Sequence, residues 1–403
     1  MHRTTALATV VVSMMIVAVI AGCGGSQGLQ PFAHEPAQGA ALKSGLTPST
    51  LLALQLEGKL EAPVPPDALR RAFQRQVSVR FYPAFSSGAT VALWASDTDF
   101  NYLLGQDATG RNTVTAIDLS KNSCYSPVAL KVDRARNVWV GCELTSTSGT
   151  NGAVQEYSGT GALEKRYVPG CPSPVSQCNS FSGYGFDSAL DSHGNVFASL
   201  NLYDIEICNP TCAQNLSAGF EWWPKGHASA TPSLISVGSN CSPVCGVGFV
   251  DVDASGNLWF TLSGYNQSTY GFGLGEVSAP TTHPKFNIVE PIGTYGFFGG
   301  VSVSNGGKTL NVIDQKTRTI LRYHLPLSPS GKPFKVLGPT QQNAFGVGDP
   351  VSGGFNQADT KMALGDTGGW FDIGKASSNA WSAVASPNFY SGIEGAAYTP
   401  SDK

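Results

Sequence analysis

Apolar and polar positions alternate in short runs over residues 85–403, and these runs recur around one kind of turn. A small-residue or apolar segment reaches an Asp-x-x-Gly-Asn-like sequence, and a second apolar segment follows it. The turn asparagines Asn137, Asn195 and Asn257 are 58 and 62 residues apart. Asp hydrogen-bonds to the backbone in such turns, and Gly and Asn tolerate positive φ. Each unit therefore predicts a hairpin of two strands.

The unit repeats along the chain, at 128–140, 188–198, 249–260 and, more weakly, 300–312; spacing indicates another at 346–363. The apolar segments are rich in β-branched and aromatic residues, which favour buried strands. Further strand-like runs follow within a unit, such as 152–157 and 274–277. Three or four strands at a period of roughly 40–60 residues are typical of the blades of a β-propeller.

The C-terminal residues 395–403 align with 300–308, so the chain ends where a second strand of the unit is due. We expect that strand at Thr90–Ala95, with a further strand at Asn112–Leu119. Glu394–Thr399 would then be the inner strand of the first blade and pair with Thr90–Ala95, leaving no open sheet edge. The prediction is an all-β, six-bladed propeller over 85–403, although the pattern alone leaves a count of seven open.

Residues 1–22 predict an export signal. The apolar run Ala6–Ala21 is too short for a membrane span and suits the core of a signal peptide. It leads into Ile20-Ala21-Gly22-Cys23, which resembles the lipobox of bacterial lipoproteins. That resemblance implies acylation of Cys23 and an anchored protein at the outer membrane or the outer face of the cytoplasmic membrane. The alternative is an ordinary signal peptide with an unmodified cysteine.

Residues 23–84 are expected to connect the anchor to the propeller. Residues 24–48 are rich in Gly, Gln, Ala and Pro and indicate a flexible tether. Ser49–Leu60 predicts a short amphipathic helix, which Pro63-Val-Pro-Pro66 ends. Four arginines follow and form either a contact with anionic lipid headgroups or a solvated face: Arg70, Arg71, Arg75 and Arg80.

Composition narrows the class of protein further. The net charge is −3 and only 13% of residues are charged, so the basic footprint of a nucleic-acid binder is missing. The 47 glycines argue against a helical bundle, while 41% apolar residues and seven tryptophans argue against disorder.

Eight cysteines remain besides Cys23, an even number that predicts disulfides in an exported protein. Cys124 precedes an inner strand and Cys142 ends the next one, so antiparallel pairing would bring them together. The alternative for the Cys-x-Pro-x-Cys pairs is a four-cysteine zinc site, which an oxidising compartment disfavours. Near-neighbour pairing predicts Cys124–Cys142, Cys171–Cys178, Cys208–Cys212 and Cys241–Cys245.

The sequence Asp253-Ala-Ser-Gly-Asn-Leu-Trp-Phe-Thr261, with Gly275-Glu-Val277 after it, resembles a repeat of streptogramin-lyase-like and NHL-type β-propellers. The likeness is one of blade pattern and implies fold rather than activity. The lyase family works with a histidine, a glutamate and a divalent metal, but no pair here matches that arrangement. Its catalytic residues are therefore not carried over. The histidines of the body lie in turns and connections: His193, His227, His283 and His324.

Lactonase-type propellers instead hold a metal through inner-strand Glu, Asp and Asn side chains. Glu394, Asp349 and Asp187 lie near such positions, so a divalent metal at the channel remains an alternative, although inner-strand carboxylates also face channel water. Glycines at the blade starts would let inner strands approach one another. The alternative is a channel mouth that stacks on a sugar or another flat ligand through aromatic rings: Tyr184, Tyr295, Phe298 and Phe345. Trp222 and Trp223 are expected in blade packing.

These observations predict a monomeric, lipid-anchored propeller of the cell envelope that binds a protein or glycan partner and catalyses no reaction. No cofactor and no nucleic acid is expected. The alternative is a metal-dependent propeller enzyme, either a streptogramin-lyase-like lyase or a lactonase-type hydrolase.

Overall fold

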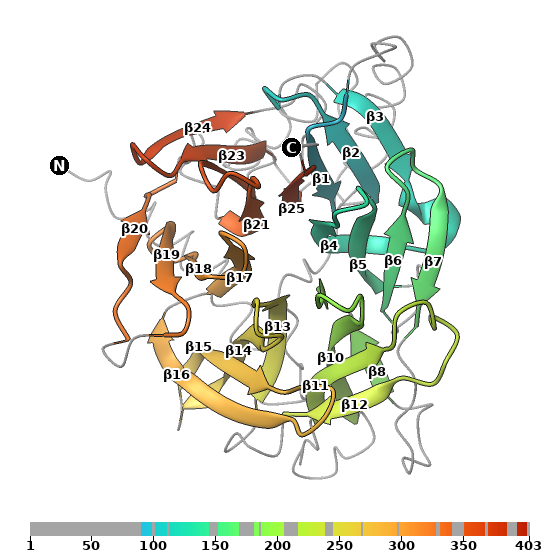
Figure 1. Ribbon diagram of the computed structural model, residues 1–403, viewed down its shortest axis with the longest axis vertical. Coiled ribbons are helices and arrows are strands. Elements are labelled where there is room, and N and C mark those ends of the chain that lie inside the picture. The colour runs from blue at the N-terminus through green and yellow to red at the C-terminus, as the bar shows by residue number, and fades with distance from the viewer. Residues whose placement is uncertain are drawn as a thin grey trace, which may run out of the picture.

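The chain forms a ring of six β-sheets around a central axis, as a computed structural model shows (Figure 1). The structure describes residues 90–98, 101–110, 113–144, 152–168, 181–184, 187–204, 217–237, 245–266, 269–295, 298–327, 331–340, 350–366, 370–384 and 393–400. The predicted signal peptide and the segment 23–84 lie outside these residues. Within the described ranges, no helix is long and apolar enough to span a membrane.

Each sheet is a blade of antiparallel strands, ordered from the axis outward. Blade 1 contains β25 (Ile393–Tyr398), β1 (Leu93–Asp97), β2 (Tyr102–Gln106) and β3 (Thr113–Asp118); blade 2 contains β4 (Tyr125–Val132), β5 (Val138–Leu144), β6 (Ala153–Tyr157) and β7 (Leu163–Tyr167); blade 3 contains β8 (Phe181–Tyr184), β9 (Ser188–Leu190), β10 (Val196–Asp204), β11 (Ser217–Trp223) and β12 (Ser233–Ser236).

The second half of the ring follows the same plan. Blade 4 contains β13 (Cys245–Val252), β14 (Leu258–Asn266), β15 (Thr269–Ser278) and β16 (Lys285–Tyr295); blade 5 contains β17 (Phe298–Ser304), β18 (Thr309–Asp314), β19 (Thr319–His324) and β20 (Lys335–Leu337); blade 6 contains β21 (Pro350–Phe355), β22 (Lys361–Asp366), β23 (Trp370–Lys375) and β24 (Ala380–Val384). One turn of 3-10 helix, η2 (Leu119–Asn122), joins blades 1 and 2.

The core of the molecule lies between the blades, with one buried apolar cluster at each of the six blade interfaces. Between blades 3 and 4, the rings of Phe220 and Phe260 meet edge to face with centroids 4.7 Å apart. Trp223 is fully buried between blades 2 and 3, and Trp222 packs against the next interface. The expectation that both tryptophans serve blade packing is confirmed.

The repeated turns join the first strand of a blade to the second. In blade 4, the N–H of Asn257 donates to Asp253 Oδ1 at 2.9 Å, and the Asn257 amide donates to Asp253 Oδ2 at 3.0 Å. The residue before the asparagine has positive φ, at +82° for Gly194 and Gly256 and at +69° for Arg136. The turn chemistry read from the sequence is therefore confirmed, with Arg136 in a conformation that favours glycine.

Ring closure is also confirmed. β25 pairs with β1 in antiparallel register, with Leu93 opposite Tyr398 and Trp94 opposite Ala397. The paired strand begins at Leu93 rather than Thr90, and β2 lies between the two strands that the sequence had suggested. The backbones of β25 and blade 2 lie so close together that position 395 requires glycine. A Cβ on Gly395 would lie 2.6 Å from the carbonyl oxygen of Val128 in blade 2.

Cys124 and Cys142 form the predicted disulfide, with Cα atoms 5.2 Å apart. Pairing of β4 with β5 places Pro127 opposite Cys142, which brings the two chain segments together. The other three pairings remain predictions. Cys171, Cys178, Cys208, Cys212 and Cys241 lie outside the described residues, and only the backbone of Cys245 is described, at the start of β13.

Candidate functional site

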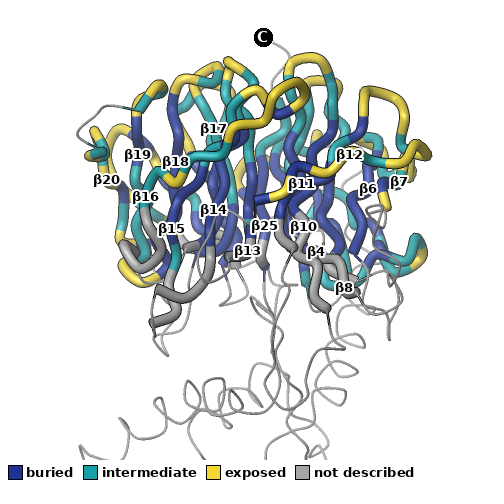
Figure 2. The backbone as a smooth tube through the Cα atoms, turned by 90° about the horizontal axis from the view of Figure 1, so that it is seen from below, coloured by how far each residue is buried: buried dark blue, intermediate teal, exposed yellow. Residues whose placement is uncertain are grey.

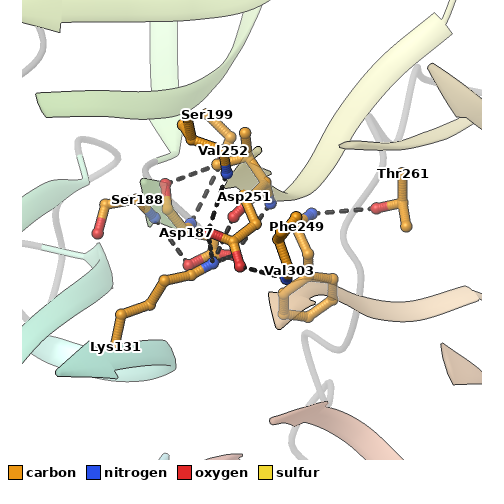
Figure 3. Close-up of polar contacts among 10 residues, drawn as sticks. Lys131, Asp187, Ser188, Ser199, Phe249, Asp251, Val252, Thr261 and Val303 are labelled. Carbon is orange, nitrogen blue, oxygen red and sulfur yellow. Dashed lines mark hydrogen bonds and ion pairs between the residues drawn. The ribbon is translucent and has the colours of Figure 1, made fainter. Parts of the chain in front are cut away.

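Three charged side chains from blades 2, 3 and 4 meet beside the axis (Figure 3). Lys131 lies in β4, Asp187 immediately precedes β9 and Asp251 lies in β13. Lys131 Nζ is 3.0 Å from Asp187 Oδ2 and 3.9 Å from Asp251 Oδ1, and it also donates to the carbonyl oxygen of Val250. Lys131 therefore reaches past blade 3 to blade 4. We call these three residues the axial cluster.

A break in the inner strand of blade 3 places Asp187 in this cluster. β8 and β9 both pair with β10, and Asp187 lies between them. Its N–H donates to Ser199 Oγ at 3.1 Å, as the N–H of Phe249 donates to Thr261 Oγ1 at 3.0 Å in blade 4. In both blades a hydroxyl of the second strand thus accepts an N–H that strand pairing leaves free. In blade 3 the local bend of the inner strand also changes the direction of the Asp187 side chain.

The carboxylates of the axial cluster also connect each blade to the next. Asp187 Oδ2 accepts the N–H of Val250 in β13 at 2.9 Å, and Asp251 Oδ2 accepts the N–H of Val303 in β17 at 2.6 Å. The remaining oxygens accept N–H groups of the following residues, Ser188 and Val252. These contacts tie blade 3 to blade 4 and blade 4 to blade 5 at the inner strands.

Burial and the neighbouring charges have opposite effects on the pKa values of Asp187 and Lys131. Burial raises the pKa of Asp187 to about 6, although the charge of Lys131 and the N–H of Val250 oppose the rise. Burial lowers the pKa of Lys131, but the charges of Asp187 and Asp251 outweigh that effect and leave the pKa above its ordinary value. At neutral pH Asp187 is therefore mostly ionised and lies beside a protonated Lys131.

The geometry assigns Asp187 to this ion pair, in contrast to the metal-ligand role considered for it from the sequence. Each of its oxygens already accepts a hydrogen bond, and only 2% of its side chain is exposed. Asp349 lies outside the described residues, and only the backbone of Glu394 is described. Among the described residues, no three His, Cys, Asp or Glu side chains gather as a metal site.

The structure leaves the predicted aromatic channel mouth untested. The backbones of Tyr184, Tyr295 and Phe298 belong to β8, β16 and β17, but their side chains are not described, and Phe345 lies outside the described residues. The glycine interpretation is confirmed at Gly300, where a Cβ would lie 2.9 Å from the Cβ of Ser352 in the next blade.

His193, His227 and His283 lie in turns or connections as expected, but His324, which was also expected in a connection, belongs to strand β19. His193 is in the Asp191 turn with 83% of its side chain exposed. His324 ends β19, and its ring stacks on Phe334 with a centroid distance of 3.9 Å.

Lys131 and Asp251 were not predicted as site residues from the sequence. Each stands two residues before the turn aspartate of its blade, Asp133 or Asp253, in an otherwise apolar inner strand. Opposite charges at equivalent repeat positions were the available signal. The sequence does not contain the distance between neighbouring blades, and this distance decides whether residues at equivalent positions come into contact.

The ring has two unlike faces. Exposed turns such as 133–137 and 253–257 gather on one of them (Figure 2). The strand order requires the second-to-third and blade-to-blade connections to leave from the opposite face, which we call the connection face. The three longest connections start and end there, at 168–180, 205–216 and 338–349.

Fold and strand order define the molecule as a six-bladed β-propeller. Solved structures with a similar fold include regucalcin of Agrobacterium tumefaciens, a calcium-binding protein, at 15% identity and TM-score 0.41 over 65% of this chain and 74% of that one. A protein of unknown function from Bacteroides caccae has 9% identity and TM-score 0.46 over 76% and 98% of the two chains.

Hydrazine synthase of Kuenenia stuttgartiensis has 9% identity and TM-score 0.44 over 74% of this chain and 93% of that one. No family model and no curated protein matches the sequence. Similarity at this level gives no argument about fold or activity, and the architecture is taken from the strand order itself.

Proposed function

We propose that this chain is a lipid-anchored protein of the cell envelope whose propeller binds a protein or glycan partner at its connection face and catalyses no reaction. The three longest connections carry this proposal. They contain only two charged residues, Glu206 and Asp349, and are rich in Ser, Asn, Gln, Gly and Pro. Loops on a rigid scaffold commonly carry binding, and this composition favours recognition through hydrogen bonds rather than charge.

The axial cluster supports the non-catalytic part of the proposal. Asp187 and Asp251 direct their oxygens to N–H groups of the neighbouring blade, and Lys131 balances their charge. A catalytic acid or base needs a proton to exchange with substrate. These groups instead fix the relative positions of blades 2 to 5.

The lipobox-like sequence at Cys23 and the tether at 24–48 support the proposed location at the cell envelope. A flexible chain of that length has a root-mean-square span of about 28 Å. Such a span would let the propeller reach partners in the membrane, in the cell wall or on a neighbouring envelope protein.

The proposal is tested by photo-crosslinking in cells that make the full chain. A crosslinking amino acid replaces Gln342 in the connection 338–349 or, as the matched control, His193 in the opposite face. We expect a discrete adduct from position 342 and none from position 193. Equal adducts from both positions would contradict a binding role for the connection face.

A glycan partner is tested with the purified chain on an array that includes peptidoglycan fragments. Retention by one glycan class, lost when Gln341, Gln342 and Asn343 are all replaced by Ala, would support the proposal. Absence of both a protein adduct and glycan retention would overturn it. Turnover of a panel of lactones and esters would contradict the non-catalytic part.

A further inference from the structure

The chain from the predicted anchor enters the propeller at the face of the repeated turns, which lies opposite the connection face and which we call the turn face. Each inner strand ends there, so Tyr398 at the end of β25 lies at this face, and Leu93 at the start of β1 pairs with it. The N–H of Ala92 donates to the carbonyl oxygen of Gln106, where β2 reaches the same face. Thr90 therefore lies at the turn face, where the exposed turns gather (Figure 2).

Exposed basic side chains are distributed over the turn face. In the described ranges, the lysine and arginine residues that are exposed in its turns, or at the strand ends beside them, are Arg134, Lys225, Lys285, Lys308, Lys332, Lys361 and Lys375. Each of blades 2 to 6 contributes at least one of them. Glu164 is the only acidic residue of the described ranges that is likewise exposed. The outermost part of the turn face is therefore predominantly basic.

The acidic residues of the repeated turns are less exposed, because they accept hydrogen bonds within the protein. Asp253 accepts the N–H of Asn257 at 2.9 Å through one oxygen and the indole N–H of Trp259 at 3.0 Å through the other. Asp359 accepts two hydrogen bonds from Arg322 of blade 5. Within the described part of the chain, no ion pair involves the exposed basic residues of the turn face. Their charges are therefore available to an external anion.

The turn face also exposes an aromatic ring beside one of these lysines. Phe334 is 45% exposed and lies two residues after Lys332, immediately before β20. His324, at the end of β19, stacks on its ring. Segments that bind a membrane surface combine apolar rings with basic side chains in this way, with the ring at the boundary between headgroups and acyl chains. Phe334 therefore adds an apolar contact to a surface that is otherwise electrostatic.

We propose that the turn face rests on an anionic lipid surface, namely that of the membrane that holds the predicted anchor. The positive charge of this face matches negative headgroups, and each basic residue near such a surface strengthens binding roughly fivefold. The entry of the chain at Thr90 points to this occupant, because the segment that leads back to Cys23 begins at the same face. A tether also confines the propeller near the membrane, so individually weak contacts are enough to orient it.

The inference rests on the lipid anchor of the proposed function and goes beyond it, because it assigns a role to the face opposite the partner. With the turn face on the membrane, the connection face is directed away from the lipid. The three longest connections would then be free to meet a protein or glycan of the envelope, and the headgroups would cover turns rather than the proposed binding surface.

The test uses the full chain, purified from membranes and reconstituted through its anchor into vesicles of phosphatidylcholine with 30% phosphatidylglycerol. A fluorescent amino acid replaces the exposed Ser255 of the turn face or the exposed Lys316 of the connection face, and the headgroups carry an acceptor dye. The length of the strands separates the two positions by roughly 20 Å. We expect energy transfer at least twofold higher from position 255 than from position 316. The difference should disappear in 0.5 M NaCl, which screens the charges, and in vesicles of phosphatidylcholine alone.

A chain labelled at position 255 that carries Lys225→Gln, Lys308→Gln and Lys361→Gln should show only the energy transfer that the parent has in high salt. Lys121→Gln with Lys316→Gln, which removes exposed lysines of the connection face, is the matched control and should leave the transfer unchanged.

Equal transfer from both positions, or transfer that responds neither to salt nor to lipid charge, would overturn the inference. Flotation of the vesicles in 0.5 M NaCl tests the anchor separately. A chain that floats without this orientation contradicts the membrane contact alone, and a chain that does not float contradicts the anchor as well.

Discussion

Asp187 combines a buried position with a nearby cation and two N–H donors, and its ionisation should affect stability. The ordinary pKa of an aspartate is about 3.9, and burial raises the pKa of Asp187 to about 6 in the folded chain. Between these values the folded chain keeps a proton that the unfolded chain releases. This group's contribution to the free energy of unfolding is therefore complete below pH 4 and decreases until about pH 6.

We expect the free energy of unfolding contributed by Asp187 to fall by roughly 3 kcal/mol between pH 4 and pH 6, given 1.36 kcal/mol for each pKa unit. Urea denaturation of the parent and of Asp187→Asn at half-unit steps measures it. The difference between the two curves should follow this decline and level off above pH 6. Parallel curves across the window would show that Asp187 does not titrate there.

Arg136 is a second residue whose conformation predicts a measurable effect. Its φ of +69° lies in the left-handed region, where the equivalent residues of the next two blades are Gly194 and Gly256. Arg136→Gly should raise the free energy of unfolding by about 0.5–1 kcal/mol, because glycine adopts this φ without steric cost.

Gly256→Ala provides the reverse control for the turn. Nothing lies within 4 Å of a Cβ at Gly256, so a loss of stability would come from the backbone alone. We expect a decrease of about 1 kcal/mol. Equal stability of all three proteins in urea would show that φ is not limiting at this turn.

At the scale of elements, β25 closes the ring across the ends of the propeller domain. Ile393 and Ala396 are fully buried, and β25 pairs with β1 along its length. Removing this strand exposes the edge of β1 together with apolar surface of blades 1 and 6.

Deletion of residues 392–403 should therefore lower the free energy of unfolding by at least about 5 kcal/mol, from lost apolar burial and several hydrogen bonds. Thermal and urea melts measure the change. Deletion of 401–403, which lie beyond the strand, is the control and should have little effect. A strand deletion that melts within a degree or two of the parent would contradict closure by β25.

At the scale of the whole molecule, the predicted lipid anchor would decide where the propeller functions. The lipobox-like sequence at Cys23 predicts acylation, and acyl chains on one residue give stable membrane attachment. Cys23→Ser should leave the precursor uncleaved and unlabelled by a fatty-acid probe, because serine lacks the thiol that accepts the lipid. Label in the variant would show that another residue is acylated. A Cys124→Ser, Cys142→Ser double variant should keep the label.

The blade pattern could be predicted because it is local. Asp253 and Asn257 form their turn with each other, and the apolar residues on both sides define strands whatever surrounds them. The closure by β25 also followed from the sequence, since residues 395–403 repeat an earlier segment and lack its second strand. β2 (Tyr102–Gln106) was missed, although Asp97 and Asn101 before it have the same spacing as Asp253 and Asn257.

The sequence by itself determined most of the strands, the repeated turns, the order of the blades and the Cys124–Cys142 disulfide. These depend on neighbours in the chain or on the pairing of adjacent strands. The meeting of Lys131 with Asp187 and Asp251 was decided only by the tertiary structure. The physical reason is that these contacts cross between blades, where the bend of each inner strand and the packing between sheets set which side chains meet.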